Sequence, residues 1–159
     1  MEFRATDKYY AMIRAYERLE RIGTNNGQTI SQTDPSDAVE SFFNQCHHFK
    51  DWLKKDYTVL SKDIEHFVSR SLPLSLASDY CNSFKHAGLD KPPRSGKTLE
   101  KINRHYDLRI GPQEVNTSAR LELTFDGKKY DTVKLARECL EYWDEFLSQN
   151  NIDLSDLNS

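Results

Sequence analysis

The chain has 159 residues, of which 22 are lysine or arginine and 25 are aspartate or glutamate, so its formal net charge is −3 near neutral pH. This length suits a single domain, because folding at roughly this size buries about 70% of the unfolded chain's surface. The charge excludes a protein that is basic overall and binds polyanions by bulk charge. There is neither a run of about 18 apolar residues nor the apolar core of a secretory signal, so we expect a cytoplasmic protein without a membrane segment.

The three cysteines, Cys46, Cys81 and Cys139, have no paired spacing, and each lies on the apolar side of a predicted helix. This pattern is typical of buried thiols in a reducing compartment. No cysteine or histidine pair has the spacing of a zinc site, and His47 and His48 point in different directions because they are consecutive on a helix. We therefore predict no metal and no cofactor.

Helical periodicity dominates the first half of the chain. Apolar residues recur at helical spacing over 7–22, which predicts a first helix. Asp34 as N-cap and Pro35 at the first helical position predict the start of a second helix. A short third helix is expected from Ser61, and a fourth over 71–88, where a proline near the start and a glycine at the end fit a helix.

The second half is less regular. The stretch 99–110 is ambiguous between loop and strand, and we assign it to loop. Residues 120–130 alternate around Asp126–Gly127, which predicts a small β-hairpin, and a last helix is expected over 132–148. The predicted fold is therefore all-α: a four-helix up-down bundle with a short extra helix and a small β-hairpin inserted before the last helix. One domain would span residues 1–149, and 150–159 would be a flexible C-terminal tail.

Polar groups gather on one side of the fourth helix. At 100° per residue, Ser75, Asp79, Asn82 and His86 fall within about 60° of one another, whereas apolar side chains occupy the other side. A basic segment follows, with seven cations between Lys85 and Arg109 against three carboxylates, a local charge of +4. Such a segment suits a surface that contacts phosphate, although a solvated loop is the more frequent explanation. The candidate binding residues are Asp79, Arg94, Lys97, Lys101 and Arg104.

The end of this helix, Asn82-Ser83-Phe84-Lys85-His86, resembles the signature of HEPN domains, small helical bundles of which many are ribonucleases. Asn82 and His86 match two positions of the signature, and Cys81 stands where the family has arginine. The resemblance implies a HEPN-like domain over 1–149 that forms a homodimer with two motifs facing one cleft. It also implies RNA or a nucleotide as ligand and, in the enzymes, metal-independent attack of the 2′-hydroxyl on the adjacent phosphate.

If the protein is an enzyme, the resemblance gives His86, Asn82 and Lys85 the catalytic roles. His86 would exchange a proton near neutral pH, and Asn82 would orient it or hold the phosphate. Lys85 is the nearest substitute for the missing arginine, but it is a point charge on a flexible stem. We therefore expect a non-catalytic or weakly active module that binds nucleotide, RNA or a partner protein. The alternative is a ribonuclease of the toxin or defence type.

Two further interpretations stay open, and a third is rejected. Lys85 and His86 also suit simple capping of a helix C-terminus. Glu40, Asn44, His47 and Asp51 share the side of the second helix away from its apolar stripe, where a carboxylate or imidazole would reach His86 across the bundle; a solvated surface is the more frequent explanation. The sequence Ser95-Gly96-Lys97-Thr98 ends like a phosphate-binding loop, but Lys91 stands where the first glycine of that motif is required, so we do not predict a nucleotide triphosphatase.

Overall fold

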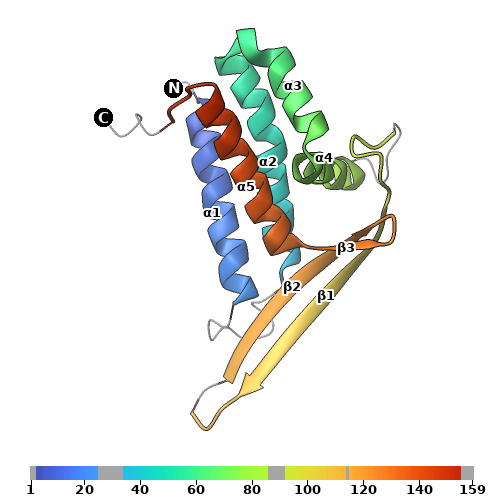
Figure 1. Ribbon diagram of the computed structural model, residues 1–159. Helices are drawn as coiled ribbons and strands as arrows, with labels where there is room; N and C mark the ends of the chain where they lie inside the picture. The colour runs from blue at the N-terminus through green and yellow to red at the C-terminus, as the bar shows by residue number, and fades with distance from the viewer. Residues whose placement is uncertain (1–2, 25–33, 86–91, 114, 155–159) are drawn as a thin grey trace.

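The computed structural model of the protein describes residues 3–24, 34–85, 92–113 and 115–154, the side chains of residues 84 and 85 excepted. Within these ranges it contains five α-helices and an antiparallel sheet of three strands in the order β1-β2-β3 (Figure 1). A 3₁₀ turn, Thr58–Leu60, joins α2 to α3. The bounds are α1 Ala5–Gly23, α2 Ser36–Asp56, α3 Ser61–Arg70, α4 Leu72–Lys85, β1 Leu99–Ile110, β2 Val115–Phe125, β3 Lys128–Asp131 and α5 Thr132–Gln149.

The prediction of an all-α fold is wrong, because the protein has a mixed α/β fold with a sheet that contributes to the core. The main error lies at residues 99–110, which form the long strand β1 rather than a loop. Residues 99–105 show no regular alternation of apolar and polar side chains, and the alternation at 106–110 is too short to identify the whole strand. Pairing with β2, from Leu99 opposite Phe125 to Ile110 opposite Val115, determines the conformation instead.

The helices do not form an up-down bundle of four. α1, α2 and α5 lie side by side, whereas α4 is seen almost end-on in Figure 1 and therefore runs across them. α3 continues from the end of α2 through the 3₁₀ turn and packs on both α2 and α4. This crossing arrangement surrounds α4 with other elements, which decides the environment of its polar groups.

The tight turn predicted at Asp126–Gly127 is present, and both residues have positive φ angles of 47° and 79°. It joins β2 to β3, which leads directly into α5. The Asp131 side chain caps α5 by accepting a hydrogen bond from the backbone N–H of Lys134. The predicted hairpin is therefore one edge of a larger sheet that lies across one end of the helices (Figure 1).

Aromatic side chains fill the centre of the helical layer. The rings of Phe49 and Trp143 lie 5.0 Å apart, as do those of Phe67 and Phe146. All three cysteines are buried, as their positions on apolar faces predict. β2 adds four apolar side chains to the same core, and the described end of the chain adds one more: Ala119, Leu121, Leu123, Phe125 and Leu154. None of the helices described is both long enough and apolar enough to cross a bilayer.

Candidate functional site

The polar side of α4 lies inside the protein as far as Asp79. Every residue from Pro73 to Cys81 is buried, including Ser75, Ser78 and Asp79. Ser75 Oγ donates to the carbonyl of Val68, at 2.8 Å. The sequence suggested one packed face and one open face, but α4 crosses between α2, α3 and the segment before β1. Its polar groups consequently find their partners within the fold.

Asp79 is the best-connected polar group on α4. Its side chain is 2% exposed and accepts hydrogen bonds from the backbone N–H groups of Arg94, at 2.7 Å, and Ser95, at 3.0 Å. The Ser95 hydroxyl donates to it as well. Hydrogen bonds to an ionised acceptor are among the strongest in proteins. Asp79 therefore fixes the segment 92–98 against α4 and acts first as a structural residue.

The segment 92–98 forms a compact loop. The N–H of Gly96 donates to the carbonyl of Pro93, at 3.0 Å, and Gly96 has a φ of 72°. The N–H of Lys97 donates to Ser95 Oγ, at 3.1 Å. Two candidate binding residues of the sequence, Arg94 and Lys97, are thereby carried on a loop that a third, Asp79, holds in place.

A carboxylate on α3 gathers three cations beside this loop. Glu65 lies 2.6 Å from Lys54 Nζ, 2.9 Å from Arg94 Nη1 and 3.4 Å from Lys50 Nζ. Burial by itself would raise the pKa of Glu65, but the hydrogen bonds from Lys54 and Arg94 and the charge of Lys50 outweigh it and lower the pKa to about 2. Lys50 is only 7% exposed, so this cluster keeps a buried ammonium neutralised.

Two polar residues of α2, Asn44 and His47, contact α4, whereas Glu40 and Asp51 are exposed. His47 Nδ1 lies 3.1 Å from Ser78 Oγ, and Cys81 Sγ donates to Asn44 Oδ1 at 2.9 Å. Burial, followed by the charge of Lys50, lowers the pKa of His47 to about 4, so its imidazole is neutral at pH 7. The spacing of Asn44 and His47 had pointed to this side of α2, but the sequence did not identify Ser78 or Cys81 as their partners.

The other candidate residues are distributed over a wider area. Arg104 donates to Ser36 Oγ, at 2.8 and 3.1 Å, and lies 3.6 Å from Asp34, so it is held at the start of α2. Lys101 is exposed on β1, and Asn82 is half-buried near the end of α4. The Lys85 side chain and His86 lie outside the described residues. The structure therefore brings together Asp79, Arg94 and Lys97, but not Arg104.

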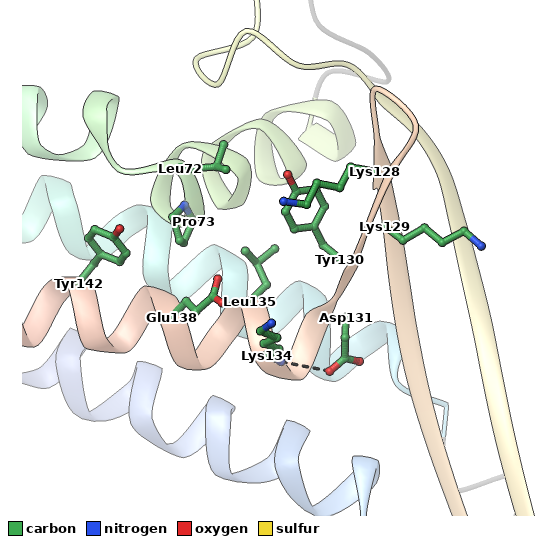
Figure 2. Close-up of a pocket in the computed structure, with 10 residues that line it drawn as sticks. All are labelled: Leu72, Pro73, Lys128, Lys129, Tyr130, Asp131, Lys134, Leu135, Glu138 and Tyr142. Carbon is green, nitrogen blue, oxygen red and sulfur yellow. Dashed lines mark hydrogen bonds between the residues drawn. The ribbon is translucent and has the colours of Figure 1, made fainter.

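A concavity lies at the opposite end of α4 from the 92–98 loop, between the first turn of α4, β3 and α5 (Figure 2). Its volume is about 450 Å³, and its walls combine apolar side chains, such as Leu135, with charged ones. Lys128 lies over the ring of Tyr130, with Nζ 5.2 Å from the ring centroid, while Lys129 points away. The buried Tyr130 hydroxyl has no hydrogen-bond partner in the described part of the chain. The pocket is separate from the residues that the sequence singled out.

Comparison with protein-family models, curated proteins and solved structures finds no match for this chain. The resemblance to HEPN domains thus depends on the short motif around Asn82. Within the described ranges, no three histidine, cysteine, aspartate or glutamate side chains cluster as metal ligands would. Functional inference therefore has to start from the geometry around α4 and the 92–98 loop.

Proposed function

We propose that the protein is a non-catalytic binding module for phosphate-bearing ligands, nucleotides or RNA, and that the ligand contacts the surface formed by the end of α4 and the 92–98 loop. The observation that carries the proposal is the attachment of this loop to Asp79. Two backbone N–H groups bound to one buried carboxylate hold Arg94 and Lys97 beside the helix turn that precedes Asn82. A preorganised cationic loop loses little entropy on binding an anion.

Local charge also favours an anionic ligand. Although the whole chain carries −3, residues 85–97 include four cations, Lys85, Lys91, Arg94 and Lys97, against one carboxylate, Asp90. Part of this charge is already neutralised, because Arg94 pairs with Glu65. We therefore expect moderate, salt-sensitive affinity rather than tight binding.

The described chemistry argues for binding rather than turnover. Where the HEPN signature has an arginine, Cys81 is buried and donates to Asn44. His47 is neutral, and Asp79 is occupied by the loop. None of these three groups is available to transfer a proton to a substrate or to stabilise charge on phosphorus. Catalysis would therefore depend on His86 and Lys85.

The test is a titration of fluorescently labelled single-stranded RNA and of labelled ATP at several salt concentrations. Lys97→Ala should weaken RNA binding about three- to tenfold and reduce the slope of log K against log salt by about one. Lys62→Ala, which removes an exposed lysine from α3, is the matched control and should leave both quantities unchanged. Absence of salt-sensitive binding to either ligand, or an equal loss in both variants, would refute the proposal.

Catalysis is tested separately. The protein and its His86→Ala variant are incubated with mixed cellular RNA in the presence of EDTA. The proposal predicts intact RNA in both samples. Cleavage by the unchanged chain that disappears in the variant would replace the binding module with a metal-independent ribonuclease.

A further inference from the structure

β1 is an edge strand with an exposed apolar end. In the order β1-β2-β3, one side of β1 has no strand partner among the described residues. The part of the β1–β2 hairpin farthest from β3 extends beyond the helices (Figure 1). In this part of the hairpin, Tyr106 is 53% exposed, Leu108 50%, Ile110 76% and Val115 57%. We call these four residues the distal strip. A long apolar edge is a ready template for pairing with another strand.

The distal strip belongs to a single face of the hairpin. Tyr106 lies opposite Ala119, Leu108 opposite Thr117, and Ile110 opposite Val115. Residues directly opposite each other in a ladder share a face, and so do alternate residues along a strand. The same face includes Leu121 and Leu123, which pack into the core. The distal strip is therefore the continuation of the core-facing side of the sheet beyond the helices.

The backbone N–H and C=O groups of Tyr106, Leu108 and Ile110 point to the unpaired edge of β1. The Thr132 hydroxyl donates to the carbonyl of Leu121, at 2.8 Å, so that carbonyl points away from β1. In an antiparallel strand, the N–H and C=O groups of successive residues point alternately to one side and to the other. The backbone groups of Arg120 therefore point toward β1, and those of its partner His105 point toward β2. It follows that Tyr106, Leu108 and Ile110 direct their N–H and C=O groups to the open side.

We propose that a second copy of the chain pairs antiparallel with this edge, with Leu108 of each copy on the two-fold axis. In this register, Tyr106 lies opposite Ile110 of the second copy, so every apolar side chain of β1 in the distal strip meets another one. Asp107 already contacts Arg109 of its own chain, at 3.2 Å, and in this register it also lies opposite Arg109 of the second copy, so the four charges alternate in sign around the axis. Cross-strand pairs of both kinds stabilise a sheet.

Neighbouring registers are less favourable. An axis at Asp107 places two aspartates opposite each other and Arg109 opposite His105, and like charges directly opposite are destabilising. An axis at Tyr106 places Arg104 opposite Leu108. Only the axis at Leu108 matches charge with opposite charge and apolar with apolar over residues 106–110. Pro112, which has no N–H, would end the pairing toward the hairpin tip.

The shape of the molecule permits this contact. Because the paired strands are antiparallel, the two helical layers would lie at opposite ends of the shared ribbon and not collide. Both distal strips would lie on the same side of the ribbon and form one continuous apolar surface. The resulting dimer would have a sheet of six strands, and its interface would leave the 92–98 loop of each copy uncovered.

Analytical ultracentrifugation of the full chain up to about 100 µM provides the first test, since weak edge pairing corresponds to micromolar dissociation constants. We expect a dimer. Leu108→Pro removes an N–H that faces the open edge and not the β1–β2 ladder, so it should yield a monomer with an unchanged circular dichroism spectrum. A monomeric wild-type chain, or a dimer that persists in Leu108→Pro, would overturn the proposal.

The register has its own test. Directly opposed strand residues have Cα atoms about 5.5 Å apart, within reach of a disulfide, whereas Tyr106 of the two copies would be offset by about 13 Å. Under mild oxidation, Leu108→Cys should form a covalent dimer and Tyr106→Cys should not; the native cysteines are buried. Equal crosslinking of both variants would contradict the register.

Charge reversal tests the ion pairs. Asp107→Arg places a second arginine opposite Arg109 and should weaken the dimer at least tenfold, while the double variant Asp107→Arg with Arg109→Asp should restore it. Glu17→Arg, on the exposed side of α1, has the same change in charge and should not alter the dimer. Failure of the double variant to recover the dimer would contradict the pairing of Asp107 with Arg109.

Discussion

Asp79 Oδ1 lies 2.7 Å from the backbone nitrogen of Arg94, 15 residues further along the chain. This contact connects a central, buried helix to a surface loop, and it makes the loop's position depend on the core. Asp79 and Arg94 were both candidate ligand-binding residues in the sequence, but their actual relationship is that one positions the other. Binding and stability are consequently coupled at this point of the fold.

The first prediction concerns this coupling. Asp79→Asn replaces one carboxylate oxygen with an NH₂ group, which cannot accept a hydrogen bond from the backbone N–H of Arg94 or Ser95. The substitution should therefore lower the free energy of unfolding by about 2 to 3 kcal/mol. Chemical denaturation measures this loss. Glu141→Gln, the corresponding change at an exposed position of α5, should stay within about 0.5 kcal/mol. If the two variants are equally stable, Asp79 does not hold the loop.

The second prediction concerns pH. The pKa of His47 is lowered in the fold to about 4, whereas the unfolded chain binds a proton near the ordinary value of 6.5. The unfolded state therefore binds more protons between these values, and stability should fall as pH decreases from 6.5 to 4, by up to about 3 kcal/mol. Denaturation midpoints over this range measure the effect.

The control for this pH dependence is another histidine. His47→Gln should flatten the stability profile between pH 6.5 and 4, whereas His66→Gln, at an exposed position of α3, should leave it as in the unchanged chain. A profile that stays steep in His47→Gln would assign the effect to other groups.

The third prediction links stability with ligand affinity. Glu65→Gln removes a carboxylate that pairs with Lys50, Lys54 and Arg94, and it should destabilise the fold by about 1 to 2 kcal/mol. This value is kept small because the Glu65 side chain is 33% exposed. The freed Arg94 should at the same time strengthen RNA binding. Fluorescence anisotropy at constant salt checks the second effect, and a weaker affinity would contradict the proposed site.

The same carboxylate also predicts a response to acid. Its folded pKa of about 2 lies below its ordinary value of 4.5. Its stabilising contribution is therefore fully present above pH 4.5 and decreases as pH falls toward 2. In Glu65→Gln this part of the acid denaturation curve should become shallower.

The fourth prediction compares two leucines of the same sheet face. Leu123→Ala removes a fully buried side chain and should cost about 2 to 4 kcal/mol, whereas Leu108→Ala removes a half-exposed one and should change the stability of the dissociated chain by less than about 1 kcal/mol. Thermal unfolding at low protein concentration measures both. Similar values would mean that the sheet does not pack on the helices as described.

The sequence by itself determined the helices. Their apolar spacing, the Ser61 start of α3 and the positive-φ turn at Asp126–Gly127 are local properties, and local patterns predict them well. The burial of the cysteines followed from the same periodicity.

Tertiary structure alone decided three features. β1 alternates apolar and polar residues only over 106–110, and its full length is defined by pairing with β2, a partner that periodicity cannot specify. α4 crosses the other helices, so Asp79 faces the core and not the solvent. The partners of Glu65 come from α2 and from the loop before β1. Each depends on contacts between distant parts of the chain, which a single sequence does not encode in any local pattern.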